Sequence, residues 1–600
     1  MLPPLGKILL SLAILGSLHQ EVRGAEVFLQ IEKQSVAVRE HPRLLLTPAI
    51  EDRLGRLEPG SPSAHMWGMV LAAAEQAVQK PGPERVMEGR RLLTVSRTYL
   101  QRLSCVALAW RLTRRPEFLA TVVADLQRVA GFSDWNPSHF LDVGEMTAAV
   151  ALAYDWTWEG LTPEVRQVAI DAIQRHGLSK FLAAPPYWAK NRNNWNPVCH
   201  GGLVLGALAI AETDPAASST VITRALRDVP QALLAYGPDG AYEEGPLYWD
   251  YGTSFLLLLA EGITSATGYA HGLDQAPGLL ASGTYIAQVR GPSGGLFNYG
   301  DGVETAPSFM AQAWFARRLQ APWMAPDLTK VPARERLLAA GLLWSLDSPA
   351  PGGEPPAQYL AGGDTPVAIL RGPGSYLAVK GGSPMANHGH QDVGSFIYET
   401  DAIRWSVDLG KEDYFKLEKE GLGIWKMDQD SDRWKVFRMS AASHAIPQIA
   451  GVDPVVTASA ALTAQDLGGS SPTIRLDLTN LYAGAASNVV RTLEFRERRA
   501  LRITDVYTKL NGPAAVRWQM VTRAKVTTTP AGLSLEQDGK TLLLSGVSAL
   551  PGRWLVEDIS RPRKPYERAN PQCSLVAWEV TPTSGEDLQM QVDVVPVDRP

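Results

Sequence analysis

The sequence predicts an α+β protein with a helical domain followed by an antiparallel β-sandwich, and a change of pattern along the chain supports this. Between Arg43 and Leu346, apolar residues recur at steps of three and four, which is the period of an amphipathic helix. Beyond residue 366 they alternate with polar residues, as in a strand with one buried face. The chain of 600 residues is also too long for one ordinary core, so two or more domains are expected.

The predicted helical domain, residues 25–346, contains several segments with this periodicity. They are marked by Leu100, Leu103, Ala107 and Trp110, by Met146, Val150 and Tyr154, and by residues 203–210. Breaks between such segments carry Pro116, Pro163, Pro185 and Pro238. Many antiparallel helices with short connections favour a helical bundle or an α/α toroid.

Residues 347–366 are rich in proline and glycine and are predicted to form a linker. Residues 367–600 then carry strand patterns, such as Ile474, Leu476 and Leu478, or Leu501 and Ile503. Short strands separated by turn residues are typical of an antiparallel β-sandwich. A cleft between the two domains is the expected place for a catalytic site.

Residues 1–24 are predicted to be a signal peptide. Lys7 supplies the positive charge, residues 8–18 are apolar but too few to span a bilayer, and Gly24 and Ala25 offer small residues for cleavage. The mature protein is therefore expected to be secreted or periplasmic, and no later segment is predicted to cross a membrane. An uncleaved anchor or a buried helix is the alternative for this segment.

Composition excludes several classes of function. The formal net charge of −5 argues against a protein that binds nucleic acid through its overall field. Three cysteines, Cys105, Cys199 and Cys573, are too few for a disulfide framework or a cysteine-rich zinc site. The 17 tryptophans and 17 tyrosines would suit sugar rings, although core packing accounts for most of them.

A cluster of scarce histidines is the strongest sign of chemistry. The chain has ten histidines, and two of them, His388 and His390, stand two residues apart after Asn387. Asp408, on an apolar run, and His444 follow. Metal binding and proton transfer are two functions that gather titratable residues in this way, so the cluster indicates an enzyme.

Several motifs in a fixed order give the chain a family likeness. They lie at residues 41–45, 135–143, 154–156, 193–199, 239–248 and 387–390. With these motifs the chain resembles the heparinase II/III-like polysaccharide lyases, a group that includes alginate and heparin lyases, over nearly all of its mature length. The resemblance implies an incomplete α/α toroid followed by the β-sandwich. It also implies an exported enzyme that cleaves a uronic-acid polysaccharide, a glycosaminoglycan or an alginate-like polymer, by β-elimination.

β-Elimination needs a base that removes the C5 proton of a uronic acid and an acid that protonates the leaving oxygen. Because the charged carboxylate makes that proton feebly acidic, hydrogen-bond donors must also be aimed at the carboxyl group. The resemblance assigns this role to Asn194, with Asn193 beside it. His388 is predicted to donate there as well or to act as the base. The other interpretation of Asn193 and Asn194 is a cap of the helix that follows.

Tyr248 is predicted to be the catalytic tyrosine, because it ends the motif at residues 239–248. Tyr251, three residues on, is the alternative, and Tyr414 matches a position where family members place another active-site tyrosine. A tyrosine can serve as general acid, or as general base in its ionised form if positive charge lowers its pKa. Each of these tyrosines could instead pack in an aromatic-rich helix.

His390, Asp408 and His444 are predicted to bind zinc, with water as a fourth ligand. The resemblance implies this metal site and a structural role, in which the ion holds the strand that carries His388. A buried His–Asp hydrogen bond without metal is the alternative. His388 and His390 would share one face of a regular strand, so different roles for them require a twist or a bulge.

Further residues near these motifs are predicted to contact the substrate. They are Arg192, Trp195, Glu244, Asn387, Arg404 and Arg438. An arginine can pair with a carboxylate or a sulfate through two hydrogen bonds. A solvated surface is the alternative for the arginines.

The predicted partner is an anionic polysaccharide and not a nucleic acid, and a homodimer is one option for the oligomeric state. Other functions stay open. A uronate C5-epimerase would remove the same proton without elimination. A hydrolase could use two of Glu243, Glu244 and Asp301, but it would not need the His, Tyr and Asn set. A catalytically inactive glycan-binding protein would bind without turnover.

Overall fold

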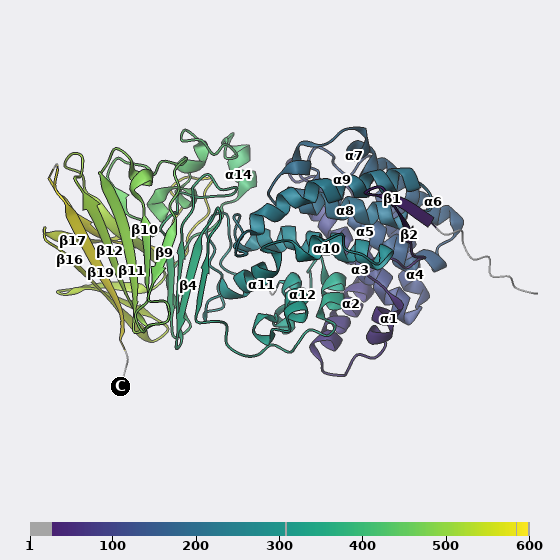
Figure 1. Ribbon diagram of the computed structural model, residues 1–600, viewed down its shortest axis with the longest axis horizontal. Coiled ribbons are helices and arrows are strands. Elements are labelled where there is room, and N and C mark those ends of the chain that lie inside the picture. Colours follow the sequence, from purple (N-terminus) through teal and green to yellow (C-terminus); the bar gives the residue numbers. More distant parts are fainter. Residues whose placement is uncertain (1–26, 307–308, 584, 598–600) are drawn as a thin grey trace, which may run out of the picture.

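The computed structural model describes residues 27–306, 309–583 and 585–597, and it divides into a helical part and a β part (Figure 1). The predicted signal peptide, residues 1–24, lies outside the described residues. The helices, purple to teal, fill one end of the molecule, and the strands, mostly green to yellow, fill the other. The α+β architecture predicted from the sequence is confirmed.

Prolines start many of the helices. The helical part contains α1 (Pro48–Leu54), α2 (Pro62–Gln79), α3 (Leu93–Thr113), α4 (Pro116–Ala130), α5 (Leu141–Thr157), α6 (Pro163–Ala172), α7 (Ser179–Ala183), α8 (Trp195–Ala209), α9 (Pro215–Leu233), α10 (Pro246–Thr267), α11 (Leu279–Gln288), α12 (Met310–Leu319) and α13 (Leu338–Ser345). The backbone N–H of a first helical residue has no partner within the helix, so a proline, which has no N–H, loses nothing there. Its fixed φ also suits that position. The breaks predicted at Pro116 and Pro163 are thus the starts of α4 and α6. No helix within the described ranges is long and apolar enough to cross a membrane.

The centre of the helical part is formed by α5 and α8, which, like α3, coincide with predicted periodic segments. α5 is buried along its whole length, and α8 is buried from Asn196 onward. Gly202 of α8 faces Gly144 of α5 so closely that a methyl group at Gly202 would overlap the Gly144 carbonyl oxygen. The absence of a side chain at Gly202 therefore lets the two backbones approach.

The β part forms three antiparallel sheets within the described residues. One has the order β3 (Gln358–Ala361), β4 (Val367–Gly372), β5 (Ser375–Lys380), β6 (Phe396–Thr400) and β7 (Ile403–Ser406). A second has the order β14 (Lys525–Thr529), β15 (Gly532–Gln537), β16 (Lys540–Ser548), β19 (Leu588–Val597), β12 (Ala500–Thr508), β11 (Asn488–Arg496), β10 (Thr473–Asp477) and β9 (Leu462–Gln465). The third has the order β17 (Gly552–Asp558), β18 (Ser574–Val580), β13 (Val516–Thr522) and β8 (Gln448–Ile449).

The sheet from β3 to β7 joins the two parts of the molecule. On β4, Val367 and Ile369 belong to the core of the helical part, whereas Ala368 and Leu370 belong to the core of the sandwich. Because successive side chains of a strand point to opposite faces, one sheet packs against both cores. β3 lies inside the segment predicted to be a linker and pairs with β4, so this sheet begins before residue 367.

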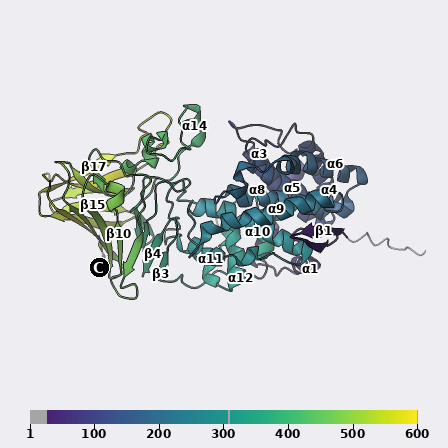
Figure 2. The same cartoon turned by 45° about the horizontal axis from the view of Figure 1, so that its top comes forward.

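Residues 414–425 of the β part, called the arm below, extend back to the helical part. The arm contains α14 (Tyr414–Lys419), which lies apart from the sandwich on the side of the helices (Figure 1 and Figure 2). Glu418 accepts two hydrogen bonds from the Arg91 guanidinium, at 3.0 and 3.1 Å. Trp425 Nε1 donates to Glu418 at 2.9 Å. These contacts hold Tyr414, the first residue of α14, close to the helical part.

Gly202→Ala is expected to lower the free energy of unfolding by about 1–3 kcal/mol, because the added methyl group must push α5 and α8 apart. Gly68→Ala in α2 is the control, since its new side chain would meet nothing within 4 Å. That substitution should leave the stability unchanged or raise it by about 0.5–1 kcal/mol. Urea unfolding followed by circular dichroism measures both variants. Equal stability of the two variants would contradict the close approach of the helices.

Candidate active site

A buried carboxylate, that of Asp301, joins the two parts of the chain at the predicted site. Asp301 follows α11, is 0 % exposed, and accepts three side-chain hydrogen bonds from residues of the β part. Its Oδ1 accepts from His390 Nε2 at 3.0 Å. Its Oδ2 accepts from His388 Nδ1 at 3.0 Å and from Arg433 Nη2 at 2.6 Å. The two histidines of the sequence motif therefore meet on one side chain.

These contacts set the charge of Asp301 and the tautomers of both histidines. Burial alone would raise the pKa of Asp301, but Arg433 and the two imidazoles hold it well below its usual range, so the carboxyl group is ionised. A carboxylate can only accept hydrogen bonds, so His388 carries a proton on Nδ1 and His390 carries one on Nε2. His388 Nε2 and His390 Nδ1 are then the nitrogens left for other chemistry.

A tight turn, not a regular strand, places the two histidines. His388 has a φ of 60°, in the left-handed region. A side chain at Gly389 would overlap the Pro384 carbonyl oxygen, so the turn needs glycine there. The Asp301 N–H donates to the His388 carbonyl oxygen at 3.0 Å. The turn gives the histidines different surroundings, which a regular strand would not, and both reach Asp301.

Tyr248, Tyr414 and His388 form one contiguous group. Tyr248 stands in the first turn of α10, and its ring stacks on the His388 ring with centroids 4.0 Å apart. The Tyr414 hydroxyl lies 3.0 Å from the Tyr248 hydroxyl and 3.2 Å from His388 Nδ1. Burial and the nearby Asp301 carboxylate raise the pKa of both tyrosines, so both phenols are protonated at neutral pH.

Glu244 gathers two amide side chains beside His388. Its Oε1 accepts from Asn194 Nδ2 at 2.9 Å and from Asn387 Nδ2 at 2.5 Å. Its Oε2 accepts from the Asn194 backbone N–H at 2.8 Å. Glu244 Oε1 also lies 3.7 Å from His388 Nε2, and burial raises the pKa of Glu244. The structure thus brings Asn194, Glu244 and Asn387 together with His388.

The segment that carries Asn194 also shows where helix capping takes place. Asn194 occupies the N-cap position of α8, but its side chain makes no capping hydrogen bond. Asn193 Oδ1 instead accepts from the Trp195 backbone N–H at 3.2 Å. The Trp195 ring packs against Tyr187 and His139, with centroids 5.8 and 5.0 Å away. Asn193 therefore supports the helix start, which leaves the Asn194 amide to Glu244.

His390, Asp408 and His444 form a buried group that could hold a metal ion. One ligand atom from each residue lies within 4.8 Å of the others. His444 Nδ1 is hydrogen-bonded to Asp408 Oδ2 at 2.9 Å. His390 Nδ1 and His444 Nε2 are buried and have no hydrogen-bond partner among the described residues. Two unpartnered imidazole nitrogens beside a carboxylate fit the donor set that zinc takes in proteins.

Tyr251 belongs to a different network from Tyr248. Its hydroxyl donates to Glu145 Oε1 at 2.5 Å. Its ring faces the guanidinium groups of Arg97 and Arg336, which lie 4.9 and 5.0 Å from the ring centroid. These partners all belong to the helical part, whereas Tyr248 touches His388. The structure therefore distinguishes the two tyrosines that the sequence leaves as alternatives.

The three arginines predicted to bind substrate are spread over the molecule and already have partners. Arg192 pairs with Asp364 at 2.5 Å, and Arg404 is buried and pairs with Glu399 at 2.6 Å. Arg438 donates to backbone carbonyl oxygens and lines a hollow next to the metal-type group. None of the three contacts His388 or Tyr248 in the described part of the chain.

Two central residues, Asp301 and Arg433, are not among the predicted site residues. The sequence suggests Asp301 only as one of the carboxylates of a hydrolase. Its position between two glycines, Gly300 and Gly302, is typical of a functional loop and is the signal that could have found it. Arg433 lies 132 residues from Asp301 along the chain, so no local pattern marks the pair.

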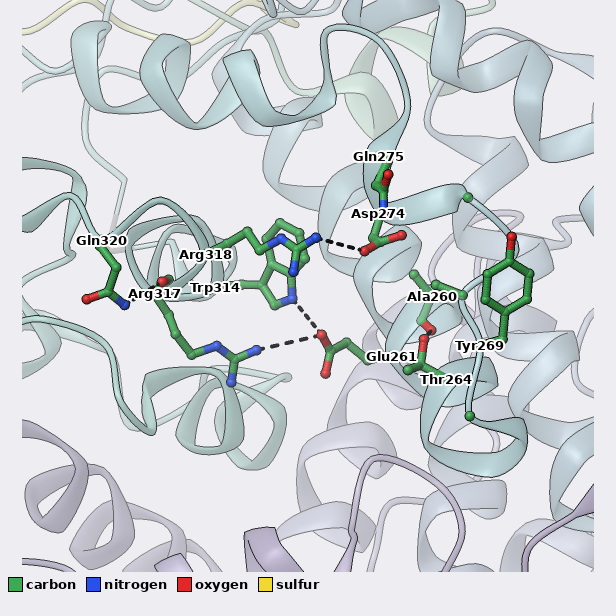
Figure 3. Close-up of a pocket in the computed structure, with 13 residues that line it drawn as sticks. Ala260, Glu261, Thr264, Tyr269, Asp274, Gln275, Trp314, Arg317, Arg318 and Gln320 are labelled. Atoms are coloured by element: carbon green, nitrogen blue, oxygen red, sulfur yellow. Dashed lines mark hydrogen bonds and ion pairs between the residues drawn. The ribbon is translucent and has the colours of Figure 1, made fainter.

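A hollow of about 620 Å³ lies elsewhere on the helical part (Figure 3). Its charged side chains pair with one another, Arg318 with Asp274 at 3.2 Å and Arg317 with Glu261 at 3.6 Å. Trp314 Nε1 also donates to Glu261, at 2.7 Å. Because these charges compensate one another and no residue of the His388 group lines the hollow, the candidate chemistry lies with His388 and its neighbours.

Comparison with known proteins identifies the fold. No protein-family model matches the chain, and no curated protein matches its sequence. The solved structure of heparinase III has a TM-score of 0.59 and 10% identity, over 84% of this chain and 77% of that chain. Heparan sulfate lyase HepC from Pedobacter heparinus has a TM-score of 0.59 and 13% identity, over 94% of this chain and 86% of that chain. The chondroitin AC lyase of Streptomyces coelicolor A3 has a TM-score of 0.51 and 14% identity, over 92% of this chain and 83% of that chain. The helical toroid followed by antiparallel β-sheets, as predicted from the sequence, is thus the fold that this chain shares with solved polysaccharide lyases.

Proposed function

We propose that the chain is a polysaccharide lyase that cleaves a uronic-acid polysaccharide by β-elimination. The stacking of Tyr248 on His388, with ring centroids 4.0 Å apart, carries this proposal. Beside this pair, the amides of Asn194 and Asn387 meet at Glu244. One place thus offers an acid, a base and donors for a carboxyl group, which are the groups that elimination needs. The fold shared with heparinase III and chondroitin AC lyase supports the same class of enzyme.

His388 is the base and Tyr248 is the acid in this proposal. Asp301 keeps the proton on His388 Nδ1, which leaves the lone pair of Nε2 to take the C5 proton. Burial raises the pKa of Tyr248, so its phenol holds the proton that the leaving oxygen needs. An ionised Tyr248 as base is disfavoured, because burial and the Asp301 carboxylate raise its pKa more than the positive charge of Arg433 lowers it.

Tyr414 orients the proton of Tyr248. Its hydroxyl lies between His388 Nδ1 and the Tyr248 hydroxyl, at 3.2 and 3.0 Å. When the imidazole N–H is shared with the Tyr414 oxygen, the Tyr414 hydroxyl can donate to the Tyr248 oxygen. The Tyr248 hydrogen then points to the substrate. His388, with its proton on Nδ1, keeps Nε2 as an acceptor.

The Asn387 amide neutralises the carboxyl group of the uronic acid. Asn387 is half-buried and uses one N–H on Glu244, so its second N–H is left for the substrate. Asn194 is 1 % exposed, and its amide holds Glu244 in place.

The proposal includes the type of substrate and the place of action. The substrate is a glycosaminoglycan or an alginate-like polymer, because elimination needs a uronate at the cleaved bond. Lys7 and the apolar residues 8–18 support export to the periplasm or beyond. An enzyme meets such a polysaccharide outside the cell, which agrees with a cleaved leader.

The zinc site is also a proposal. His390, Asp408 and His444 would hold one zinc ion through a nitrogen of each imidazole and the carboxylate. When bound, the ion supplies a fixed positive charge and no proton transfer. Because His390 also donates to Asp301, an ion on its other nitrogen would stiffen the turn that carries His388.

Tyr248→Phe is expected to lower kcat of elimination by about 10²–10⁴-fold, because the general acid is lost. Ultraviolet absorbance of the unsaturated uronate, over a panel of uronic-acid polysaccharides, measures this. Tyr251→Phe removes the same group one helical turn away and should lose far less activity. Full activity of Tyr248→Phe would contradict its role. Exchange of the C5 hydrogen with solvent deuterium without unsaturated product would instead indicate an epimerase.

Asp301→Asn is expected to lower the free energy of unfolding by about 3–5 kcal/mol, because the buried Arg433 loses its carboxylate. It should also abolish turnover, since an amide no longer fixes the tautomer of His388. Adding Arg433→Met removes the unpaired charge, so the double variant should regain stability but not activity. Chemical unfolding and the ultraviolet assay separate the two effects. A stable and active Asp301→Asn variant would rule out this account.

The purified protein is expected to hold about one equivalent of zinc, which elemental analysis measures. A chelator should lower Tm, and added zinc should restore it, because the ion binds the folded state alone. His444→Ala should lose the metal, whereas His65→Ala, an exposed histidine of α2, should keep it. Protein without metal whose Tm does not respond to the chelator would favour a plain His–Asp hydrogen bond.

A further inference from the structure

A hollow of about 360 Å³ lies beside Asp408, and more cations than carboxylates line it. Its cations are Lys411, Arg438, Arg523 and Arg568, and its carboxylates are Glu304 and Asp408. Ligand sites of proteins commonly have volumes of about 300–1000 Å³. The size and the charge of the hollow therefore suit a small anionic molecule or one anionic unit of a larger one.

The carboxylates of the hollow do not balance its cations. Glu304 is taken by Arg523, whose Nη1 donates to Glu304 Oε1 at 2.9 Å. Asp408 Oδ2 is already hydrogen-bonded to His444 Nδ1 at 2.9 Å. Lys411 has no carboxylate at ion-pair distance in the described ranges, and burial lowers its pKa. A half-buried ammonium group without a counter-ion is stabilised by any anion that enters.

Arg438 adds a second positive charge, and its ion pair with Glu412 is long, at 3.6 Å. It is 8 % exposed, and its guanidinium donates to the carbonyl oxygens of Leu409, Lys411 and Ala569. Its Nε has no hydrogen-bond partner within the described part, and the Glu412 carboxyl group lies 3.6 Å from it. Both Glu412 oxygens also accept from the Arg568 backbone N–H, at 3.0 Å, so this carboxylate is shared. Carbonyl dipoles solvate Arg438 but do not cancel its charge.

Two asparagines that line the same hollow carry unpartnered acceptor oxygens. Asn298 Oδ1 and Asn570 Oδ1 are buried and lack a hydrogen-bond partner among the residues described. Their amide nitrogens are already used, because Asn298 Nδ2 donates to the Asp408 carbonyl at 3.1 Å and Asn570 Nδ2 to the Ile559 carbonyl at 3.0 Å. The oxygens must therefore accept. A bare oxyanion cannot donate to them, whereas a sugar hydroxyl can.

We propose that this hollow binds one acidic sugar unit, with its carboxylate or sulfo group on Lys411 and Arg438 and its hydroxyls on Asn298 and Asn570. The unpaired Lys411 ammonium and the Arg438 guanidinium select the anionic group, and unpartnered amide oxygens select the hydroxyls. The exposed Arg568 stands at the rim, where it attracts anions from solvent.

The hollow adjoins the proposed active site through two segments of chain. The Lys411 N–H donates to the carbonyl oxygen of Gly302 at 3.0 Å, and Gly302 follows Asp301. Lys411 also precedes Tyr414 by three residues. The sugar unit is therefore assigned to the polysaccharide on which His388 acts, and this assignment rests on the proposed function.

Lys411→Met tests the site, because it removes the charge while it keeps most of the length of the side chain. Lys180→Met, an exposed lysine of α7, is the matched control. The thermal shift of the whole protein is measured with glucuronate, with glucose and with inorganic sulfate at constant ionic strength. Glucuronate should raise Tm of the wild type and of Lys180→Met, glucose should not, and Lys411→Met should lose the response. In the ultraviolet assay, Lys411→Met should raise KM for the polysaccharide about tenfold and leave kcat nearly unchanged.

Each other outcome decides against a part of this assignment. An unchanged glucuronate response and KM in Lys411→Met would overturn the site. A sulfate response as large as that of glucuronate, lost in Lys411→Met without any change in KM, would mean an adventitious ion only and would overturn the sugar unit. If the wild type cleaves no polysaccharide but Lys411→Met still loses the glucuronate response, the proposed function fails and the acidic-sugar site stands.

Discussion

The Asp301 carboxylate is the interaction on which the candidate site depends, because both parts of the chain meet there. Asp301 lies in the helical part, and its three side-chain donors come from the β part. A buried carboxylate is tolerated when its charge is matched and its oxygens are hydrogen-bonded. Arg433 supplies the charge, and His388 and His390 supply the other bonds. The packing that satisfies Asp301 is therefore the same packing that orients both imidazoles.

Exclusion of water around Asp301 also sets the protonation of the aromatic group. Tyr248 and Tyr414 lie close to this negative charge and away from solvent, which raises the pKa of both phenols. His388 faces the same carboxylate and donates its Nδ1–H to it. Two rings in contact thus meet one buried charge in different ways: the phenol keeps its proton, and the imidazole donates an N–H to the carboxylate. In the proposed function, Tyr248 takes the acid role and His388 the base role on these grounds.

Short-range patterns predict much of the fold, and long-range contacts explain what they do not predict. α3, α5 and α8 follow the helical periodicity, and β10 and β12 follow the strand alternation, because each pattern records which side chains are buried. The proline- and glycine-rich residues around β3 predict a linker. The segment is nevertheless a strand, because it pairs with β4. Tyr248 and Tyr251 stand one turn apart on α10, so only packing decides which one faces His388. Arg433 contacts Asp301 although 132 residues of sequence separate them, and a local periodic pattern cannot predict such a pair.

The attachment of the arm by Glu418 and Arg91 has a consequence for how such a chain can change over generations. Neither half carries a complete set of site residues: the helical part contributes Asn194, Tyr248 and Asp301, and the β part contributes His388, Tyr414 and Arg433. A recombination event that exchanged one half for that of a distant relative would separate Asp301 from its partners. Both halves must therefore stay matched for the site to be complete, and a substitution on one side of the junction constrains those that the other side can accept.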